Sequence, residues 1–248
     1  MKVLSVAGYH HTGKTTTVVA IIKELKKRGY IVQSIKDIHS ENYQIDVEGS
    51  NSWQHWEASN ERVIARSLNG TNLIWHERLS LNQMLDHLQA DYVVVEGMKT
   101  AFLPRIICAE SEEQLNELVD GKVFAISGKW ANEHSKYKNL PVLKSIDEVE
   151  KIVDLIEEKV FEVLPMSKPE CCSACGLTCE KMVSAILSGE KKRSDCLTDR
   201  VDKIEINVGG RNIKIVPYMQ NMITDTINAL LDGVAGCEKG TIEIKIKR

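Results

Sequence analysis

The sequence of 248 residues lacks a long apolar run, a strong net charge and internal repeats. A membrane-spanning helix needs about 20 consecutive apolar residues, and no stretch reaches that length, so we expect no membrane association. The apolar run that follows Met1 is too short for a secretory signal peptide, which favours a cytoplasmic protein. The net charge is only −3. We therefore expect no nucleic acid partner, because non-specific binding needs a basic surface.

The residues that are present indicate a globular α/β protein. Apolar residues make up 43% of the chain and charged residues 27%, which is enough to build a sizeable core. Strands are predicted at residues 2–8, 30–36, 62–67, 71–77, 92–97, 104–110 and 122–128, and helices at 15–28, 80–89, 112–118 and 145–164. The apolar strand at 92–97 is typical of a parallel sheet. Residues 41–61 are predicted to be irregular.

The pattern changes after the segment Pro165–Glu170, whose two prolines mark the predicted boundary between domains of residues 1–165 and 166–248. Before it, Ser145 and Glu148 predict a capping box that opens the last helix of the first domain. The second domain is predicted to be a small α+β unit. Its expected elements are a helix at 180–188, a hairpin around Gly209–Gly210, a helix at 220–231 and a strand at 241–247.

The run from Gly8 to Thr15, GYHHTGKT, matches the phosphate-binding pattern G-x-x-x-x-G-K-[ST]. It follows a predicted strand and precedes a helix, so its backbone N–H groups and the helix N-terminus favour phosphate. This predicts a P-loop NTPase fold, with Lys14 on the β- and γ-phosphates and the Thr15 hydroxyl on Mg²⁺. The residues predicted to hold the nucleotide are Gly8, Tyr9, His10, His11, Thr12, Gly13, Lys14, Thr15 and Thr16. A guanine-reading N-K-x-D motif is absent, so the residues alone leave GTP and ATP both open.

Acidic residues nearby are candidates for the metal end of the nucleotide site. Glu96 ends a predicted central strand and could hold Mg²⁺ or the attacking water. With Lys14, it is the candidate for a catalytic role. Asp46 is a further candidate Mg²⁺ ligand. Asp37 and His39 could face the metal or the γ-phosphate, or lie in a solvated loop. Trp53 and Trp56 could stack on a ligand ring or be buried under the loop.

Three stretches together resemble one family: VAGYHHTGKTTTVVAIIKELKKRGYIVQSIKDIHSE, IDVEGSNSW and DYVVVEGMKTAFLPRIICAE. They look like MobB, the molybdopterin-guanine dinucleotide biosynthesis adaptor family. The resemblance implies a P-loop fold that binds GTP with Mg²⁺, at most weak GTPase activity, and usually a homodimer. It implies a helper role toward the enzyme that joins a guanine nucleotide to molybdopterin, the molybdopterin guanylyltransferase. The molybdopterin cofactor and a molybdenum or tungsten enzyme are the other implied partners.

Carried onto this chain, the resemblance places Gly8–Thr16 on the phosphates and Glu96–Gly97 at the Mg²⁺ end. It places Asp46 and the stretch Glu48–Trp53 near the γ-phosphate or the pterin. The chain departs from the family at Asp37, where the family usually has histidine. It also reads Gly-Ser-Asn-Ser where the family usually has Gly-Lys-Asp followed by Ser or Thr.

Cysteines cluster in the second domain, with five of the seven between positions 171 and 196. Such clustering in a cytosolic chain favours metal ligation over disulfides. The candidate ligands of a [4Fe–4S] cluster are Cys172, Cys175, Cys179 and Cys196. The segment CSACGLTCEKMVSAILSGEKKRSDC resembles the iron–sulfur segment of RnfB-type electron-transport subunits and corrinoid iron–sulfur proteins, with one residue fewer before the third cysteine. Cys171 therefore stays open as an alternative ligand, and Zn²⁺ as an alternative metal.

The leading hypothesis is a GTP-binding accessory protein of molybdenum or tungsten cofactor maturation. In this hypothesis the iron–sulfur domain senses redox state or docks a partner. The alternatives are an ATP- or GTP-dependent ligase or kinase that acts on a small molecule, and a nucleotide-driven reductive activator. A ligase or kinase needs a general base near Lys14, and the sequence offers only loop acids and His39 for that role.

Overall fold

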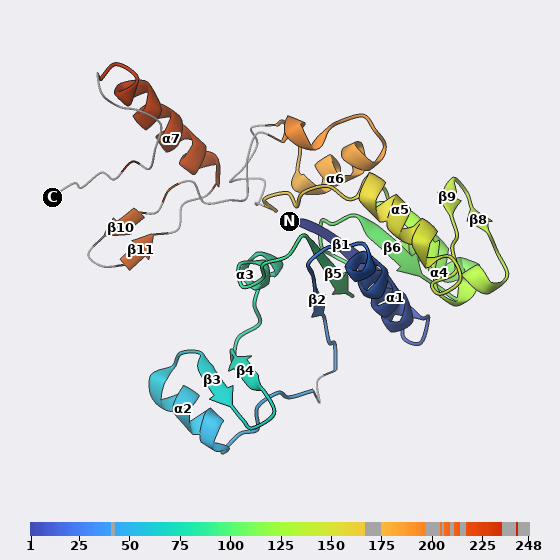
Figure 1. The fold of residues 1–248 in the computed structure, drawn as a ribbon, viewed down its shortest axis with the longest axis horizontal. Coiled ribbons are helices and arrows are strands. Elements are labelled where there is room, and N and C mark those ends of the chain that lie inside the picture. The colour runs from blue at the N-terminus through green and yellow to red at the C-terminus, as the bar shows by residue number, and fades with distance from the viewer. Residues whose placement is uncertain are drawn as a thin grey trace. The chain divides into compact units, whose positions relative to one another are not determined.

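The computed structural model of the chain describes residues 1–40, 43–166, 175–196, 204, 206–208, 211–213, 217–234 and 242. The chain forms two compact units, Met1–Glu162 and Val163–Arg248 (Figure 1). That residues 1–165 bind a nucleotide and residues 166–248 bind a metal through cysteines stays a prediction. Within the described residues, no helix is both long and apolar enough to cross a membrane.

A five-stranded parallel sheet forms the centre of the first unit, in the order β2-β5-β1-β6-β7 (Figure 1). Its strands are β1 (Lys2–Gly8), β2 (Val32–Lys36), β5 (Tyr92–Glu96), β6 (Arg105–Cys108) and β7 (Val123–Ser127). The last three of these are buried along their whole length. Their mostly apolar sequences follow from that burial, because a parallel sheet is covered on both faces. The predicted α/β fold with a mostly parallel sheet is confirmed.

Two helices lie side by side in this unit, α1 (Lys14–Lys27) and α5 (Val149–Lys159). α1 packs on β1, β2 and β5. Arg28, just past α1, forms ion pairs with Asp154 at 2.8 Å and Glu157 at 2.7 Å. These pairs join the two helices, so α5 helps to fix the helix that follows the phosphate loop.

Shorter elements complete the first unit. They are α3 (Leu81–Leu85), α4 (Glu112–Leu118), η1 (Lys129–Asn132), β8 (Lys136–Tyr137) and β9 (Leu140–Pro141). Leu115 of α4 packs into a buried cluster with Ile107 of β6 and Ile126 of β7. Because the five strands are parallel, their carboxyl ends lie at one edge of the sheet. The loops that follow them gather there, which is where α/β sheets bind ligands.

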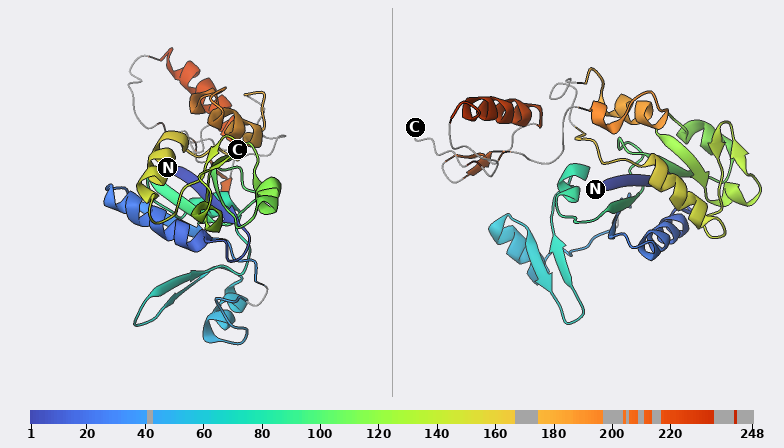
Figure 2. Two further views of the ribbon diagram at one scale, coloured as in Figure 1. Left: turned by 90° about the vertical axis from the view of Figure 1, so that its right-hand side faces the viewer. Right: turned by 45° about the horizontal axis from the view of Figure 1, so that its top comes forward.

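A small lobe is inserted between β2 and β5 (Figure 2). Its elements are α2 (Asn51–Ser59) and the antiparallel hairpin of β3 (Val63–Arg66) and β4 (Thr71–Ile74). The hairpin confirms two predicted strands, but the prediction of an irregular segment over residues 41–61 is wrong for residues 51–59, which form α2. The Ser50 hydroxyl accepts a hydrogen bond from the Trp53 N–H and caps α2. A serine cap offsets the weak helix propensity of this polar stretch.

The capping box predicted for α5 is also wrong. The helix begins at Val149, and no side chain caps it. Glu148 accepts a hydrogen bond from the Lys144 N–H at 3.1 Å instead. Ser145 Oγ lies 2.7 Å from Thr17 Oγ1 of α1. The hydroxyl that was predicted to cap the helix therefore forms a contact between distant segments instead.

The second unit contains α6 (Cys179–Leu187), η2 (Arg193–Asp195), β10 (Ile206–Val208), β11 (Arg211–Ile213) and α7 (Pro217–Leu231). The predicted hairpin around Gly209–Gly210 is confirmed, because β10 pairs antiparallel with β11. The two predicted helices correspond to α6 and α7. The predicted strand at 241–247 lies outside the described residues, apart from Ile242.

Candidate functional site

The phosphate loop joins β1 to α1, as predicted, and its backbone turns sharply. His11 has φ of 61° and Gly13 has φ of 99°, in the left-handed region that glycine adopts without strain. Thr12 is buried, and its hydroxyl donates to the Tyr9 carbonyl at 2.9 Å. The side chains of Tyr9, His10 and His11 are exposed. The loop is therefore held by Thr12 and by backbone shape rather than by its histidines.

Three lysines surround this loop. The Lys14 ammonium donates to the Tyr9 carbonyl. The Lys99 ammonium lies 3.9 Å from the centre of the Tyr9 ring, in a cation–π contact. Burial is the main cause that lowers the pKa of Lys14, and the charges of Lys99 and Lys36 act in the same direction. These charges make the surroundings of the loop electropositive, which suits an anionic ligand.

Two glycines let the loop approach its neighbours closely. A Cβ at Gly8 would lie 2.0 Å from the Cys108 carbonyl oxygen, and one at Gly128 would lie 2.2 Å from the Thr12 carbonyl oxygen. Gly128 follows β7, and the next residue, Lys129, donates its N–H to the same Thr12 carbonyl at 3.1 Å. The motif identified Gly8. It missed Gly128, because position 128 requires glycine only through a contact between segments far apart in the sequence.

Thr15 and Glu96 lie together beside the loop. Thr15 Oγ1 donates to Glu96 Oε1 at 2.8 Å, and Lys36 Nζ lies 3.3 Å from the same oxygen. Glu96 is buried, with 9% of its surface exposed. Adjacent ligands in the octahedral shell of Mg²⁺, each about 2.0–2.1 Å from the ion, are separated by about 2.9 Å. The spacing and the hard oxygen donors of Thr15 and Glu96 therefore fit the predicted metal.

A network of hydroxyl groups and one thiol lies beneath the loop. Thr17 Oγ1 is 3.3 Å from Cys108 Sγ, and Ser145 Oγ is 2.9 Å from Ser127 Oγ. With the bond between Thr17 and Ser145, these contacts connect α1, β6, β7 and the segment before α5. Burial raises the pKa of the Cys108 thiol to about 12. Cys108 is therefore a neutral core residue, which confirms the interpretation of its apolar strand.

Asp46 lies in a separate cluster. Its carboxylate accepts hydrogen bonds from the Ser50 hydroxyl at 2.9 Å and the Ser52 hydroxyl at 2.7 Å. It also lies 3.2 Å from His76 Nε2. The hydrogen bond from Ser52 is the main cause that lowers the Asp46 pKa, and Ser50 and His76 add to it. In the described part of the chain Asp46 has no contact with the phosphate loop, so its role as a Mg²⁺ ligand stays a prediction.

The two tryptophans of α2 pack around His76. The Trp56 ring is stacked on the imidazole with centroids 4.1 Å apart, and the Trp53 ring meets it edge-on at 4.6 Å. The two indoles are 5.0 Å apart. The three rings are half-buried and pack on one another, which favours a packing role over ligand stacking.

Asp37 and His39 follow β2 at the carboxyl edge of the sheet, on the side of Glu96. The Asp37 N–H donates to the Glu96 carbonyl at 2.9 Å. The Asp37 carboxylate lies 3.1 Å from His39 Nε2 and 3.3 Å from Arg78 Nη2. Since Asp37 is held beside Glu96, a contact with the γ-phosphate stays a prediction for this segment.

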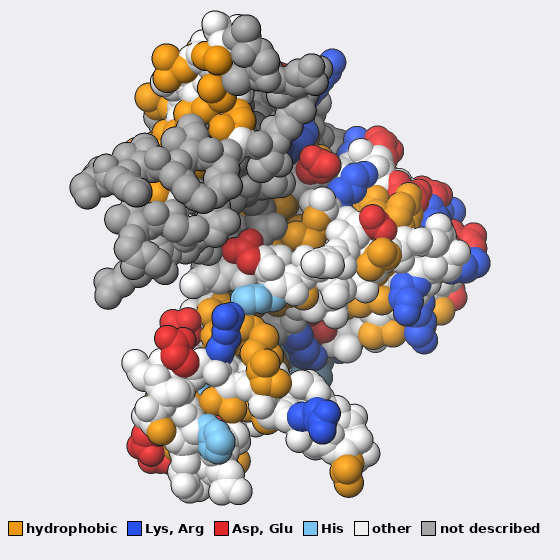
Figure 3. Space-filling model, turned by 60° about the vertical axis from the view of Figure 1, so that its left-hand side comes forward, with side chains coloured by type: hydrophobic (Ala, Val, Ile, Leu, Met, Phe, Trp, Pro, Cys, Tyr) orange, Lys and Arg blue, Asp and Glu red, His pale blue; other side chains and the backbone are white. Residues whose placement is uncertain are grey.

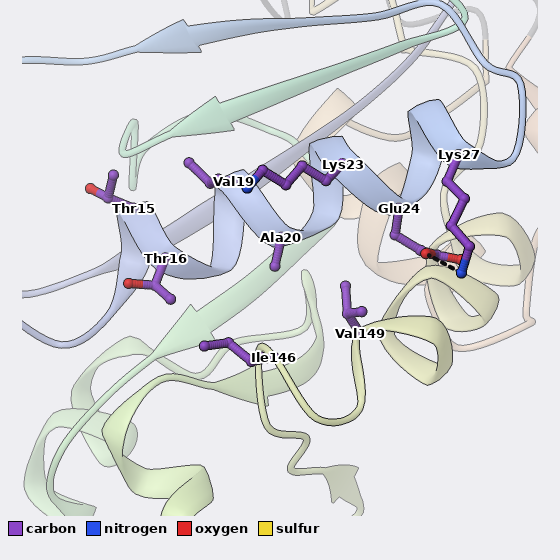
Figure 4. Close-up of a pocket in the computed structure, with 9 residues that line it drawn as sticks. All are labelled: Thr15, Thr16, Val19, Ala20, Lys23, Glu24, Lys27, Ile146 and Val149. Carbon is purple, nitrogen blue, oxygen red and sulfur yellow. Dashed lines mark ion pairs between the residues drawn. The ribbon is translucent and has the colours of Figure 1, made fainter.

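A shallow groove of about 600 Å³ runs along the outer side of α1 (Figure 4). It starts at Thr15 and Thr16 and ends near the ion pair of Glu24 and Lys27, whose atoms are 3.3 Å apart. Its middle is apolar and is lined by Val19, Ala20, Ile146 and Val149. Neither Lys14 nor Glu96 lines it, so it meets the proposed nucleotide site only at Thr15 and Thr16.

The cysteines of the second unit are placed only in part. Cys179 and Cys196 are buried and Cys175 is half-buried. Among the described residues, no group of three or more cysteine, histidine or carboxylate side chains could hold a metal ion. As placed, these three thiols therefore do not fit a cluster. Cys171 and Cys172 lie outside the described residues.

The parallel sheet, the loop between its first strand and helix, and the adjacent Thr15–Glu96 pair define a P-loop α/β protein. The sequence profile of one family, Molybdopterin guanine dinucleotide synthesis protein B or MobB, matches residues 3–128. The chain belongs to the MobB family, as the three resembling stretches predicted.

Relatives and a solved structure extend this match. A chain of Methanocaldococcus jannaschii, provisionally named a molybdopterin-guanine dinucleotide biosynthesis adapter protein, is 25% identical over an alignment of 254 positions. The alignment covers 99% of this chain and 97% of the relative. The adapter protein of Haemophilus influenzae is 32% identical over 62% of this chain and 86% of its own length. The crystal structure of Bacillus subtilis MobB superposes with a TM-score of 0.53 at 21% identity, covering 66% of this chain and all of that one. This structure supports the fold alone. The first alignment runs through both compact units.

Proposed function

We propose that this chain is a GTP- and Mg²⁺-binding adapter in the synthesis of molybdopterin guanine dinucleotide. The observation that carries the proposal is the phosphate loop with Lys14 across it and the Thr15–Glu96 pair beside it. Membership of the MobB family supplies the pathway, because relatives carry that role in their names. Mg²⁺ held by Thr15 and Glu96 would neutralise charge on the terminal phosphates. The proposed partners are a molybdopterin guanylyltransferase or a molybdenum or tungsten enzyme, together with the cofactor itself.

The adapter role implies slow hydrolysis at most. A fast GTPase needs a group that positions or activates the attacking water. The carboxylate of Glu96 is already engaged by the Thr15 hydroxyl and the Lys36 ammonium. We therefore expect tight binding to be separable from turnover, with GTP hydrolysed slowly and no group transferred to a small acceptor.

Titration of the protein with GTP, with and without Mg²⁺, tests the proposed nucleotide site. Thr15→Val removes one proposed metal ligand, so we expect it to lower the Mg²⁺-dependent part of the affinity by roughly 10-fold. Thr71→Val removes an exposed hydroxyl that lies outside the predicted nucleotide-binding residues and should leave the affinity unchanged. Equal affinity with and without Mg²⁺ in the wild-type protein would contradict the metal assignment. A wild-type protein that binds no nucleoside triphosphate would contradict the function.

We propose further that the second unit holds a metal centre through its cysteines, as a [4Fe–4S] cluster or, alternatively, Zn²⁺. The support is the C-x₂-C-x₃-C spacing with a later cysteine, which suits four thiolates around one centre. The burial of Cys179 and Cys196 adds to it. Because the three described thiols do not meet as placed, this centre would need Cys171 or Cys172 and a shift of the others.

Metal analysis of anaerobically purified protein decides this proposal. We expect iron and sulfide with broad visible absorbance, or zinc without colour, at about one centre per chain. A double variant Cys175→Ser, Cys179→Ser should lose the metal, whereas Cys237→Ser, outside the cluster of cysteines, should keep it. Wild-type protein free of iron, sulfide and zinc would exclude both centres.

The lobe of α2, β3 and β4 supports the proposal that the adapter is a homodimer. Its apolar side chains Ile64 and Leu68 are 69% and 104% exposed, and Tyr43, Ile45 and Val47 before the lobe are also exposed. Figure 3 shows hydrophobic side chains gathered on this part of the surface. α2 packs on β3, yet these apolar side chains stay exposed, and a second copy of the chain would remove them from water.

Light scattering after size exclusion tests the dimer. We expect a mass of two chains for the wild-type protein and of one chain for Ile64→Lys, since a buried charge disrupts an apolar interface. Ile31→Lys changes a side chain that is also exposed, at 62%, but lies outside the lobe, and should stay dimeric. A wild-type monomer at micromolar concentration would exclude this assembly.

A further inference from the structure

Three loops meet on the side of the phosphate loop that is opposite to Glu96. The Lys129 N–H, after β7, donates to the Thr12 carbonyl of the phosphate loop at 3.1 Å. The Trp130 N–H donates to the Ala109 carbonyl, after β6, at 2.8 Å. The side chains continue this contact, because Lys129 Nζ lies 2.9 Å from Glu110 Oε2. The result is a carboxylate–ammonium pair fixed beside the phosphate loop by backbone hydrogen bonds.

The strand order places this pair on the nucleoside side of the proposed site. The Thr15–Glu96 pair, which would hold the metal at the terminal phosphates, involves β5 on one side of β1. β6 and β7 lie on the other side of β1. A nucleotide whose γ-phosphate is near Glu96 and whose phosphates follow the loop must direct its base toward the segments after β6 and β7. Ligands of α/β sheets bind outside these carboxyl ends.

The chemistry of the pair suits a hydrogen-bonding ligand better than a structural role. The Glu110 and Lys129 side chains are 42% and 53% exposed, and exposed ion pairs contribute little to folding. The hydrogen bond from Lys129 is the main cause that lowers the Glu110 pKa, and His11 of the phosphate loop adds to it. Glu110 is therefore an ionised acceptor at neutral pH, with two oxygens.

We propose that Glu110 is the residue that selects guanine, and that Lys129 positions its carboxylate. Guanine presents N1–H and the 2-amino group as adjacent donors, which two carboxylate oxygens can accept together. Adenine presents a lone pair at N1 and no donor at C2, so the same carboxylate would be left unpaired against it. Such an unpaired group is the main source of discrimination between similar ligands. This inference rests on the proposed nucleotide-binding function and gives a chain without N-K-x-D a means to prefer GTP.

Affinities for GTP, ATP and xanthosine triphosphate, measured with Mg²⁺ on the full chain, test the assignment. The wild-type protein should prefer GTP over both others by roughly 10- to 100-fold, as expected for one bidentate base contact. In Glu110→Gln the side-chain amide can donate to the 2-oxo group of xanthine and accept from its N1–H. We therefore expect this variant to lose affinity for GTP and to bind xanthosine triphosphate more tightly than GTP. A merely structural role of Glu110 would not exchange one base for another.

Glu112→Gln is the matched control, since it removes the same charge from an exposed position two residues away and should keep the preference for GTP. Equal affinity of the wild-type protein for GTP and ATP would overturn the inference. So would a Glu110→Gln variant that still prefers GTP as strongly as the wild type. In either case nucleotide binding itself would persist, whereas the absence of any nucleotide binding would instead contradict the proposed function.

Discussion

Replacing Lys14 with alanine is expected to lower the affinity for GTP by roughly 100-fold. The variant loses both the hydrogen bond from the ammonium to the phosphate and the positive charge, and a hydrogen bond to a charged group is worth about 1.5–3 kcal/mol. Lys14 is the lysine that lies across the loop, on the Tyr9 carbonyl. Neither Lys36 nor Lys99 can replace it, since Lys36 is paired with Glu96 and Lys99 lies over the Tyr9 ring. Isothermal titration of the variant with GTP and Mg²⁺ measures the effect.

Lys26→Ala is the matched control for Lys14. It removes an equal charge from the last turn of the same helix, where Lys26 is exposed, and should leave the affinity within error of the wild type. The thermal midpoint of both variants should stay close to that of the wild-type protein. If Lys14→Ala bound GTP as well as Lys26→Ala does, the assignment of the loop to phosphate would be wrong.

Gly128→Ala should strongly destabilise the first unit. The new Cβ would lie 2.2 Å from the Thr12 carbonyl oxygen and 3.0 Å from the Cys108 Cβ, so the backbone of the phosphate loop or of β7 must move. The φ of 79° adds strain for any residue with a side chain. Together these terms should cost about 3–5 kcal/mol. For a unit of this size that lowers the melting temperature by roughly 10 °C. The shifted Thr12 carbonyl should also weaken GTP binding.

Gly29→Ala separates the clash from the backbone strain. Gly29 also has a positive φ, of 93°, but a Cβ there would meet nothing within 4 Å. It should cost about 1 kcal/mol from its backbone conformation alone. Differential scanning calorimetry of the two variants measures both losses. Equal losses would mean that the contact between Gly128 and the phosphate loop does not constrain the fold.

The features that the sequence predicted well are those that depend on consecutive residues. The phosphate loop is one continuous motif, and its Lys14 and Thr15 follow from the pattern itself. The pairing of Thr15 with Glu96 was predictable too, because an acid at the end of a buried parallel strand must lie at the edge where the loop lies. The apolar strands themselves were recognisable from their composition, since burial on both faces leaves little room for polar residues.

The features that it missed depend on what one segment meets in another. α2 formed where an irregular segment was predicted, because Ser50 caps a helix whose tryptophans pack around the distant His76. Ser145 did not cap α5, because its hydroxyl is bonded to Thr17 and Ser127. In both cases a long-range contact decided between local alternatives that are close in energy.

The sequence by itself determined that this is a parallel α/β protein with a phosphate loop, and its family-specific stretches assigned it to MobB. Periodicity, the glycine-lysine motif and the strand-end acid are local signals, so one chain read in order contains them. Only the tertiary structure decided that Gly128 must be glycine and that Glu110 and Lys129 stand together beside the loop. Those facts arise where β6 and β7 lie next to β1. The sequence around these residues gives no sign that they lie close together, because their hydrogen bonds and packing contacts join segments that are far apart in the chain.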